Sequence, residues 1–371
     1  MEKQSTRLGV GLGLLITAFL ITGLLGFSLT GRGSEQVLAS SAGTKAQVRN
    51  FKLYVRDTTL KMPDGKQIYV FGYTDDPQGP AKIPGPVLTV NEGDTVNLTL
   101  VNDKDPTKTS FNPDGDGHTI HLHGLDLPSA MDGDPMTSPT QDSVKEGSQY
   151  TYHFVAKEAG TYWYHCHESA TEHIQMGMYG AFIVLPRGGD THYAYAGTPR
   201  FDKSYTLVLS DMDSGAHQQD YTNLHSGGDN PNWTQYRPDY FLMNGHAWPD
   251  IMDDPSSFIQ ATVGQHLLVR LINCGYTVHA IHSHGFHFTV IATDGRKLSD
   301  PYQKDTLLLA PGERYDILFD LNQAGRYMFH DHIEQNTTNN GDYPGGMMTF
   351  INVNNPDGSN PVPMSSLHMN G

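Results

Sequence analysis

Apolar and polar residues alternate along this chain over short segments that are separated by turn-forming residues. Residues 87–101 alternate in this way around a turn at Gly93, and residues 258–272 do so around a turn at Gly264. A two-residue period is typical of β-strands with one buried face. Long segments with a helical period are missing, so the pattern predicts an all-β protein built from Greek-key sandwiches or barrels.

The strand pattern belongs to a larger repeat in the sequence. The segment Ala159–His167 matches Ala324–His332, and His118–Gly124 matches His279–Gly285 at nearly the same offset. A repeat of this length indicates a duplicated domain rather than a solenoid.

The repeat sets the expected domain boundaries. We expect one β-domain at about residues 45–190 and a second at about 200–355, each long enough to enclose its own core. Residues 188–199 form the candidate linker. The tail at residues 356–371 is rich in Pro, Ser, Asn and Gly and is predicted to be disordered.

The N-terminus has the pattern of an export signal. Lys3 and Arg7 precede an apolar run at residues 8–29, and small residues follow at 39–42. The run is long enough to cross a bilayer, so it fits either a cleaved signal peptide or an uncleaved anchor. Residues 1–44 are therefore predicted to be a signal peptide or N-terminal membrane anchor plus a linker. Either reading predicts an exported protein, in the periplasm, on the cell surface or secreted.

Charge and cysteine content narrow the classes of partner. The formal net charge is −16, which makes nucleic acid an unfavourable partner because its phosphates would be repelled. The chain has two cysteines, Cys166 and Cys274. If Cys166 binds a metal, no disulfide forms, and Cys274 in its apolar segment is a small buried core residue.

Four His-x-His pairs carry the chemistry. Residues i and i+2 of a strand point to the same face, so each pair presents two imidazoles side by side. Imidazole binds copper, zinc, iron and nickel. One pair alone is weak support for a metal site, but four pairs at matching places in two repeats indicate a polynuclear centre. The pairs are His121/His123, His165/His167, His282/His284 and His330/His332.

The residue between two such histidines points to the opposite face, and in the second pair it is Cys166. A thiolate there can serve a second metal site behind the histidines. His118 and His173 are candidate partners, and Met178 is the candidate axial ligand, with Met176 as its competitor. Two His, one Cys and a weak axial Met form a blue-copper electron-transfer site.

The second repeat lacks this thiolate site. Asp331 stands where the first repeat has Cys166, and no histidine occurs between Ile333 and Gly346. His279, the match to His118, is interpreted as a leftover of duplication, and Asp331 as a residue that forms local hydrogen bonds.

These motifs together resemble the multicopper oxidase family, in particular its two-domain, laccase-like group with the blue copper in the first domain. The resemblance rests on segments 118–124, 165–178, 279–285 and 330–334 and covers nearly all of the chain after residue 50. It implies two cupredoxin-like Greek-key β-sandwich domains and four coppers per chain. The implied type 1 ligands are His118, Cys166, His173 and Met178. The implied type 2 ligands are His121 and His282, and the implied type 3 ligands are His123, His165, His167, His284, His330 and His332.

The resemblance also implies proton donors and an assembly. Asp132 and Glu334 match the acidic positions that deliver protons near the three-copper cluster, with Glu168 as a competitor for the second role. Because each repeat supplies half of that cluster, the site lies between two domains. In related two-domain oxidases this junction forms between neighbouring chains of a homotrimer.

The predicted function is oxidation of a phenol, an aromatic amine or a metal ion, one electron at a time, coupled to reduction of dioxygen to water. The donor is expected to dock at an exposed edge of His173. A copper nitrite reductase and a periplasmic copper-binding or storage protein are the alternatives, and the first is disfavoured by the complete set of eight histidines. The segment at residues 211–233, read as a loop, has no assigned role.

Overall fold

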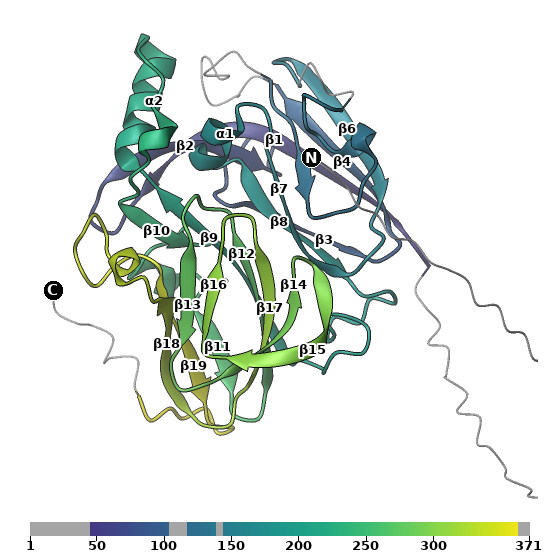
Figure 1. The fold of residues 1–371 in the computed structure, drawn as a ribbon, viewed down its shortest axis with the longest axis vertical. Coiled ribbons are helices and arrows are strands. Elements are labelled where there is room, and N and C mark those ends of the chain that lie inside the picture. Colours follow the sequence, from purple (N-terminus) through teal and green to yellow (C-terminus); the bar gives the residue numbers. More distant parts are fainter. Residues whose placement is uncertain (1–44, 104–116, 139–143, 363–371) are drawn as a thin grey trace, which may run out of the picture. The chain divides into compact units, whose positions relative to one another are not determined.

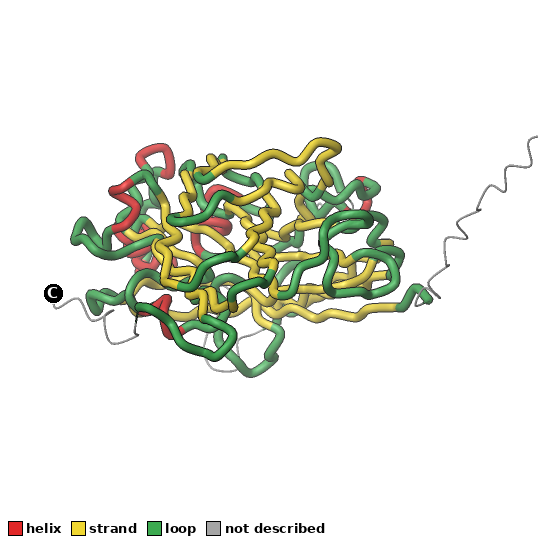
Figure 2. Tube along the Cα trace, turned by 90° about the horizontal axis from the view of Figure 1, so that it is seen from below, coloured by secondary structure: helices red, strands yellow, loops and turns green. Residues whose placement is uncertain are grey.

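Four β-sheets form the framework of the described chain, two in each half of the sequence (Figure 1). The structure is a computed structural model that describes residues 45–103, 117–138 and 144–362. Strands far outnumber helices, and the helices are short (Figure 2). The prediction of an all-β protein is therefore confirmed. The predicted signal peptide or anchor at residues 1–44 lies outside the described residues.

The first half contains two four-stranded sheets. Its strands are β1 (Val48–Lys61), β2 (Gln67–Thr74), β3 (Gly85–Asn91), β4 (Thr95–Asn102), β5 (His121–His123), β6 (Ser148–Val155), β7 (Gly160–His165) and β8 (Tyr179–Leu185). One sheet has the order β2-β1-β4-β6 and the other β3-β8-β7-β5. The pairs β1/β4 and β3/β8 are parallel, as crossover connections require.

The second half contains larger sheets. Its strands are β9 (Lys203–Met212), β10 (Tyr240–Met243), β11 (Ile259–Thr262), β12 (His266–Asn273), β13 (His279–Ser283), β14 (Phe288–Thr293), β15 (Arg296–Lys304), β16 (Thr306–Leu309), β17 (Arg314–Asp320), β18 (Gly325–Asp331) and β19 (Met348–Asn354). The strand orders are β10-β9-β12-β17-β14-β15 and β11-β19-β18-β13-β16.

The two halves share one topology. The order β2-β1-β4-β6 corresponds to β10-β9-β12-β17, and β3-β8-β7-β5 corresponds to β11-β19-β18-β13. The parallel pairs recur as well, at β9/β12 and β11/β19. The second half adds β14, β15 and β16. The internal repeat in the sequence is thus matched by a repeat in strand order.

Each half encloses its own apolar cluster, because the alternating strands turn their apolar faces inward. Leu98 and Phe182 belong to the first cluster, and Val269 and Phe319 belong to the second. A third cluster joins the halves, with Trp163 from β7 packed together with residues of β9, β10 and β12.

Helices are minor elements and connect strands. They are α1 (Ala170–Met176), α2 (Ser214–Ser226) and the 3-10 turns η1 (Ser129–Met131), η2 (Trp233–Gln235), η3 (Asp250–Asp253) and η4 (Glu334–Thr337). Within the described ranges, no helix has the length and apolar character needed to cross a membrane. Helix α2 lies in the segment that the sequence pattern predicted to be a loop.

A buried polar network also joins the halves. The Asp316 carboxylate on β17 accepts hydrogen bonds from Thr161 on β7 at 2.6 Å and from the Tyr195 hydroxyl at 2.5 Å, and it pairs with Arg270 on β12 at 3.3 Å. Tyr195 belongs to the candidate linker and packs with Leu318 of the second half and Ala159 of the first, so the linker is not a loose connection.

The beginning of the tail is also held in place. Asn360 donates hydrogen bonds to the carbonyl groups of Val353 at 3.0 Å and Gly325 at 3.3 Å. Backbone acceptors at the end of the last sheet thus contact the first part of the tail, and the disorder expected for residues 356–371 stays a prediction. Residues 363–371 lie outside the described residues.

Candidate metal centre

Strand pairing brings the His-x-His pairs together. In the antiparallel pair β5/β7, His121 lies directly opposite His165. In the equivalent pair β13/β18, His282 lies opposite His330. Directly opposed residues of an antiparallel pair point to the same face, so each half builds one cluster of four imidazoles.

The first histidine set consists of His121, His123, His165 and His167. Its ring centroids lie between 5.0 and 5.8 Å apart in the pairs that touch. Ring nitrogens of His121, His123 and His165 all lie within 4.8 Å of one another. Trp163 stacks against His123 and covers His165, which shields this side of the set from water.

The second histidine set consists of His282, His284, His330 and His332. The Nε2 atoms of His284 and His330 are 3.2 Å apart, so these rings turn the same atoms toward one point. His282 and His284 line an open depression of about 420 Å³ together with Asp305. The second set thus faces outward into a concave surface.

Backbone carbonyls orient four of these imidazoles. A carbonyl oxygen can only accept a hydrogen bond, so the Nδ1 atom of each of these rings carries the proton and donates. The Nε2 atom then keeps its lone pair, which can bind a metal. The hydrogen bonds run from His121 to Asp132 O (2.7 Å), from His165 to Cys166 O (2.8 Å), from His282 to Asp305 O (2.8 Å) and from His330 to Asp331 O (2.9 Å). The matching hydrogen bonds of His165 and His330 show that the two repeats orient these imidazoles in the same way.

Burial keeps several of these rings neutral, as metal ligands must be. Burial, with the nearby Arg314 and His121, lowers the pKa of His123 to about 3. Burial and His121 also hold the pKa of His165 well below its usual range. In the second set, burial lowers the pKa values of His284 and His330. These rings are therefore unprotonated near neutral pH, and their nitrogens can bind a metal ion.

The thiolate cluster consists of His118, Cys166 and His173, and lies behind the first histidine set. Its ligand atoms lie within 4.8 Å of one another, and Cys166 Sγ is 3.3 Å from His173 Nδ1. All three side chains are 0% exposed, whereas the rings of His165 and His167 contact each other. Cys166 thus points away from the histidines on either side of it.

The thiolate cluster fits a soft metal ion. Both ring nitrogens of His118 are buried without a hydrogen-bond partner, which is costly unless a metal uses one of them. Burial opposes ionisation of Cys166, but His173 and His118 outweigh it and lower the pKa of the thiol to about 5. A thiolate with two imidazoles is the donor set of a blue-copper site.

Two methionines lie beside the thiolate cluster, and both are 0% exposed. Met178 accepts a backbone hydrogen bond from Cys166 at 3.0 Å and donates one to His173 O at 2.9 Å. Met176 is the last residue of α1. The direct backbone connection of Met178 to two cluster residues favours it as the axial ligand.

Three carboxylates lie next to the histidine sets. Asp132 is 3.4 Å from His121 Nδ1, and Glu334 is 3.5 Å from His332 Nδ1. The third is Asp134, 3.5 Å from His167 Nδ1, which the sequence reasoning missed. The sequence contained a signal for Asp134, because it follows Asp132 by two residues. The turn around Gly133 makes its closeness to His167 hard to predict from the sequence. Glu168 instead has its backbone oxygen 3.6 Å from Cys166 Sγ.

The interpretation of His279 as a leftover is wrong. His279 is 0% exposed, and its Nδ1–H donates to the Asp331 carboxylate at 2.7 Å, while Nε2 lies 3.4 Å from Asp211. Asp331 also accepts from Asn336 at 2.8 Å and from the Ile333 amide at 3.0 Å. An imidazole between two carboxylates therefore occupies the place that the thiolate cluster has in the first half, and Asp331 forms the local hydrogen bonds that the sequence predicted.

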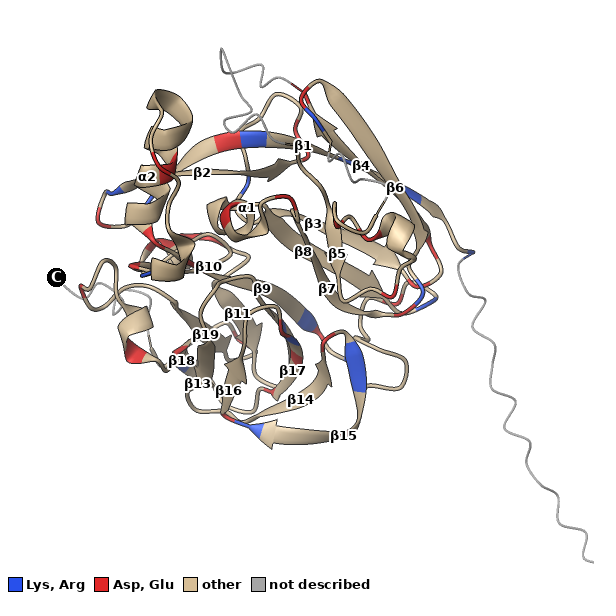
Figure 3. Ribbon diagram, turned by 45° about the horizontal axis from the view of Figure 1, so that its top comes forward, with Lys and Arg blue, Asp and Glu red and all other residues tan. Residues whose placement is uncertain are grey.

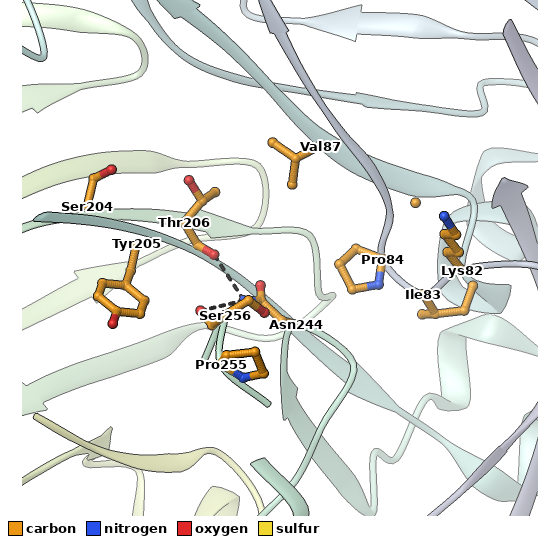
Figure 4. Close-up of a pocket in the computed structure, with 11 residues that line it drawn as sticks. Lys82, Ile83, Pro84, Val87, Ser204, Tyr205, Thr206, Asn244, Pro255 and Ser256 are labelled. Atoms are coloured by element: carbon orange, nitrogen blue, oxygen red, sulfur yellow. Dashed lines mark hydrogen bonds between the residues drawn. The ribbon is translucent and has the colours of Figure 1, made fainter. Parts of the chain in front are cut away.

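The expected exposed edge of His173 is also absent from the structure. His173 belongs to α1, and Phe71 packs against its ring, which leaves the side chain completely buried. A cavity of about 720 Å³ lies elsewhere, between the loop before β3 and the strand β9 (Figure 4). Lys82, Tyr205 and Asn244 line this cavity, and no predicted metal ligand does.

Comparison with known proteins places these features in a family. Residues 79–189 and 203–355 each match a multicopper oxidase family model. Laccase-7 from rice is 32% identical over 251 residues, covering 66% of this chain. The chain spans only 41% of the length of that relative.

Two solved structures resemble nearly the whole described chain. The blue copper oxidase from Nitrosomonas europaea is 31% identical with a TM-score of 0.66, over 83% of this chain and 86% of its own. The multicopper oxidase mgLAC is 31% identical with a TM-score of 0.69, over 87% and 90% of the two chains. The sheets are thus cupredoxin-like, as the resemblance implied. With a thiolate cluster and two histidine sets arranged on that fold, this chain belongs to the multicopper oxidase family.

Proposed function

We propose that this protein is a laccase-like, copper-dependent oxidoreductase that takes electrons singly from a reducing substrate and reduces dioxygen to water. The observation that carries this proposal is the tripeptide at residues 165–167. Its central thiolate belongs to one buried cluster, while its two imidazoles belong to another. Two metal centres joined by one short stretch of backbone form a path for electrons between a donor side and an oxygen side.

The proposed ligands follow the two kinds of cluster. His118, Cys166, His173 and Met178 would hold the type 1 copper, and His121 and His282 the type 2 copper. The type 3 pair would be held by His123, His165, His167, His284, His330 and His332. The cupredoxin domains that carry them are proposed to span residues 45–190 and 200–355, each with its own apolar cluster.

Bound copper supplies the one-electron chemistry that protein side chains lack. The chain contributes position, shielding and protons. Trp163 excludes water from one side of the first histidine set, and the apolar residues around Cys166 exclude it from the thiolate cluster. Asp132 and Glu334 are proposed to deliver the protons that reduction of dioxygen consumes, because each carboxylate lies beside one histidine of a set. Asp134 is positioned to assist beside His167.

The two histidine sets are proposed to meet between chains of a homotrimer. No ring contact among the described residues joins a histidine of the first set to one of the second. His167 is 39% exposed and His332 is 53% exposed, so both sets are open at their rims. A three-copper cluster needs both sets around one cavity, and a second copy of the chain would provide the missing half.

We also propose that the protein is exported, to the periplasm, the cell surface or the medium. Support comes from the basic residues Lys3 and Arg7 followed by the apolar run at 8–29. The same run would serve as a cleaved signal peptide or as a membrane anchor. Phenols, aromatic amines and low-valent metal ions are the proposed classes of donor.

Copper content and spectroscopy test the proposed function. The purified protein is expected to bind about four coppers per chain, with one blue and one ordinary paramagnetic signal, and to consume oxygen with a phenol. Cys166→Ser is expected to abolish the blue absorption and the donor-driven oxygen uptake while keeping copper in the histidine sets. Persistence of both properties in Cys166→Ser would refute the proposal.

The same measurements distinguish the two alternatives. Nitrite reduction without oxygen uptake would favour a nitrite reductase. Copper binding without turnover would favour a storage protein.

A further inference from the structure

Electrons must reach the thiolate cluster through covering side chains. His118, Cys166 and His173 are 0% exposed, so no donor can touch a ligand of this site. The rate of electron tunnelling falls steeply with the length of the gap, so the side chains between the cluster and the surface determine where donors work. The rings next to the cluster therefore identify the route.

A continuous series of aromatic rings leads outward from the cluster along β2. Phe71 is buried and lies 5.4 Å from the His173 ring and 6.4 Å from the His118 ring, between centroids. Tyr69 lies 6.4 Å from Phe71 on the same face of the strand, because the two residues are two positions apart. The series thus starts in contact with two predicted ligands.

Helix α2 supplies the outer end of the series. The Tyr69 ring lies 5.0 Å from Tyr221 and 5.5 Å from His225. Tyr221 and His225 are four residues apart on one face of the helix and stack on each other at 4.2 Å. Tyr221 is 39% exposed and His225 is exposed, so the series of rings ends in water.

The helix is fixed in this position by buried contacts. The His217 side chain is 0% exposed and donates its Nδ1–H to the backbone carbonyl of Tyr69 at 2.7 Å. The Asp213 side chain caps the helix by accepting from the Ala216 amide at 2.9 Å. Both α1 and α2 lie beside β2 in Figure 1. The two aromatic residues of α2 are therefore held against the rings of the strand.

We propose that the rings of Phe71, Tyr69, Tyr221 and His225 form the electron input path to the thiolate cluster, with the Tyr221/His225 stack as the docking site for an aromatic donor. A phenol stacked there would give up one electron to the Cu(II) ion that the thiolate cluster would hold, reducing it to Cu(I), and would release its proton to water, which leaves a phenoxyl radical. The donor site lies on helix α2 and not at a metal ligand. This proposal rests on the proposed function.

The charge of the whole chain sets a preference among aromatic donors. The formal net charge is −16, and Figure 3 shows acidic segments at both α1 and α2. Neutral phenols and cationic aromatic amines are therefore favoured over phenols that carry a carboxylate, because the negative field of the protein repels anions.

The test is the anaerobic reduction of the blue absorption band by hydroquinone in stopped flow. Tyr221→Leu and Tyr69→Leu are expected to lower the second-order rate constant about tenfold, the scale of one lost aromatic contact. Tyr221→Phe keeps the ring and is expected to recover most of the rate lost in Tyr221→Leu. Tyr302→Leu, which removes an exposed tyrosine of β15, is the matched control and is expected to leave the rate unchanged.

A second readout does not depend on turnover. A redox-inert methoxybenzene is expected to shift the nuclear magnetic resonance signals of Tyr221 and His225 in copper-free protein, and not in Tyr221→Leu. The blue absorption and the paramagnetic spectrum are expected to stay unchanged in copper-loaded Tyr221→Leu, which shows that the cluster is intact.

The outcomes separate the two proposals. Wild-type reduction rates in Tyr221→Leu and Tyr69→Leu would overturn the electron path while leaving the oxidase function in place. A wild-type protein that lacks the blue band, or that consumes no oxygen with any donor, would instead overturn the proposed function. Should Tyr69→Leu fail to fold, the exposed Tyr221→Leu decides the question alone.

Discussion

At the scale of single residues, one aspartate distinguishes the second half from the first. Asp331 occupies the place of Cys166 and binds His279 instead of a metal. Burial disfavours protonation of His279, but the nearby carboxylates of Asp211 and Asp331 outweigh it and raise the pKa of His279 to about 9. A cationic imidazole between two carboxylates balances charge in a core that would otherwise contain two buried anions.

The His279 network predicts a pH-dependent stability. Because its pKa is raised in the folded state, the stabilisation is complete below about pH 6.5 and is lost as the pH rises through about 9. His279→Gln is expected to lower the unfolding free energy of copper-free protein by about 3 kcal/mol at low pH, and by less at high pH. Urea titrations at both pH values measure this difference. The control His266→Gln, at an exposed pair with Asp320, should cost less than about 1 kcal/mol. A pH-independent loss in His279→Gln would contradict the assignment.

Asp132 allows a second prediction at this scale. Its carboxylate lies beside His121, and a proton donor there is expected to contribute about a hundredfold to the oxygen half-reaction. Asp132→Asn should therefore slow reoxidation of the reduced enzyme by oxygen about a hundredfold, as measured in stopped flow over a range of pH, while the blue band remains. Asp126→Asn, an exposed carboxylate paired with Arg296, is the control. Equal reoxidation rates in the two variants would remove Asp132 from the proton path.

At the scale of elements, strand register determines which histidines meet. The pairings of His121 with His165 and His282 with His330 follow from backbone hydrogen bonds between strands. A shift of one residue would turn every histidine to the other face, so the register and the metal sites are coupled. Helix α2 shows the opposite case. The helix is polar on nearly all sides, so no apolar period in the sequence predicted it. The cap at Asp213 and the contact of His217 with Tyr69 hold it in place.

The turn that carries Asp132 allows a test at this scale. Gly133 has a φ of +79°, and a Cβ there would collide with the backbone oxygen of Ile120. Gly133→Ala is expected to cost more than about 1 kcal/mol and to displace Asp132 from His121. Gly147→Ala has the same kind of backbone, with a φ of +80°, but open space around the added atom. Thermal unfolding of both variants separates the two effects, because Gly147→Ala has only the backbone strain and Gly133→Ala also has the collision. Similar losses of stability in the two variants would show that a small shift relieves the collision.

At the scale of the whole molecule, polar and apolar contacts join the two halves into a single unit. Asp316 receives hydrogen bonds from Thr161 of the first half and from Tyr195 of the connecting segment, and pairs with Arg270 of the second. Trp163 packs into an apolar cluster shared by both halves. The halves are therefore expected to unfold together.

Removal of the shared carboxylate tests this coupling. Asp316→Ala leaves the buried Arg270 without its charged partner and is expected to cost about 3–5 kcal/mol, with one calorimetric transition in both proteins. Asp320→Ala, on the same strand but at a carboxylate that is 76% exposed, should cost less than about 1 kcal/mol. Two separate transitions in the wild type would show that the halves unfold independently.

Mixing of inactive chains tests the proposed trimer. A chain with His121→Ala lacks part of the first histidine set, and a chain with His282→Ala lacks part of the second. If the three-copper cluster forms between chains, unfolding and refolding the two variants together should restore a fraction of the oxygen uptake, because some interfaces contain two intact sets. Each variant refolded alone is the control. No recovery in mixed trimers of demonstrated composition would place the complete cluster within one chain.

The sequence alone determined the all-β class, the duplication and the grouping of histidines into His-x-His pairs, because side-chain alternation along a strand is a local property. It also placed Cys166 opposite its neighbouring histidines for the same reason. Only the tertiary structure decided the buried state of His173, the partners of His279, the proximity of Asp134 to His167 and the position of α2. These features arise from contacts between segments far apart in the chain, and no periodicity within a single segment encodes them.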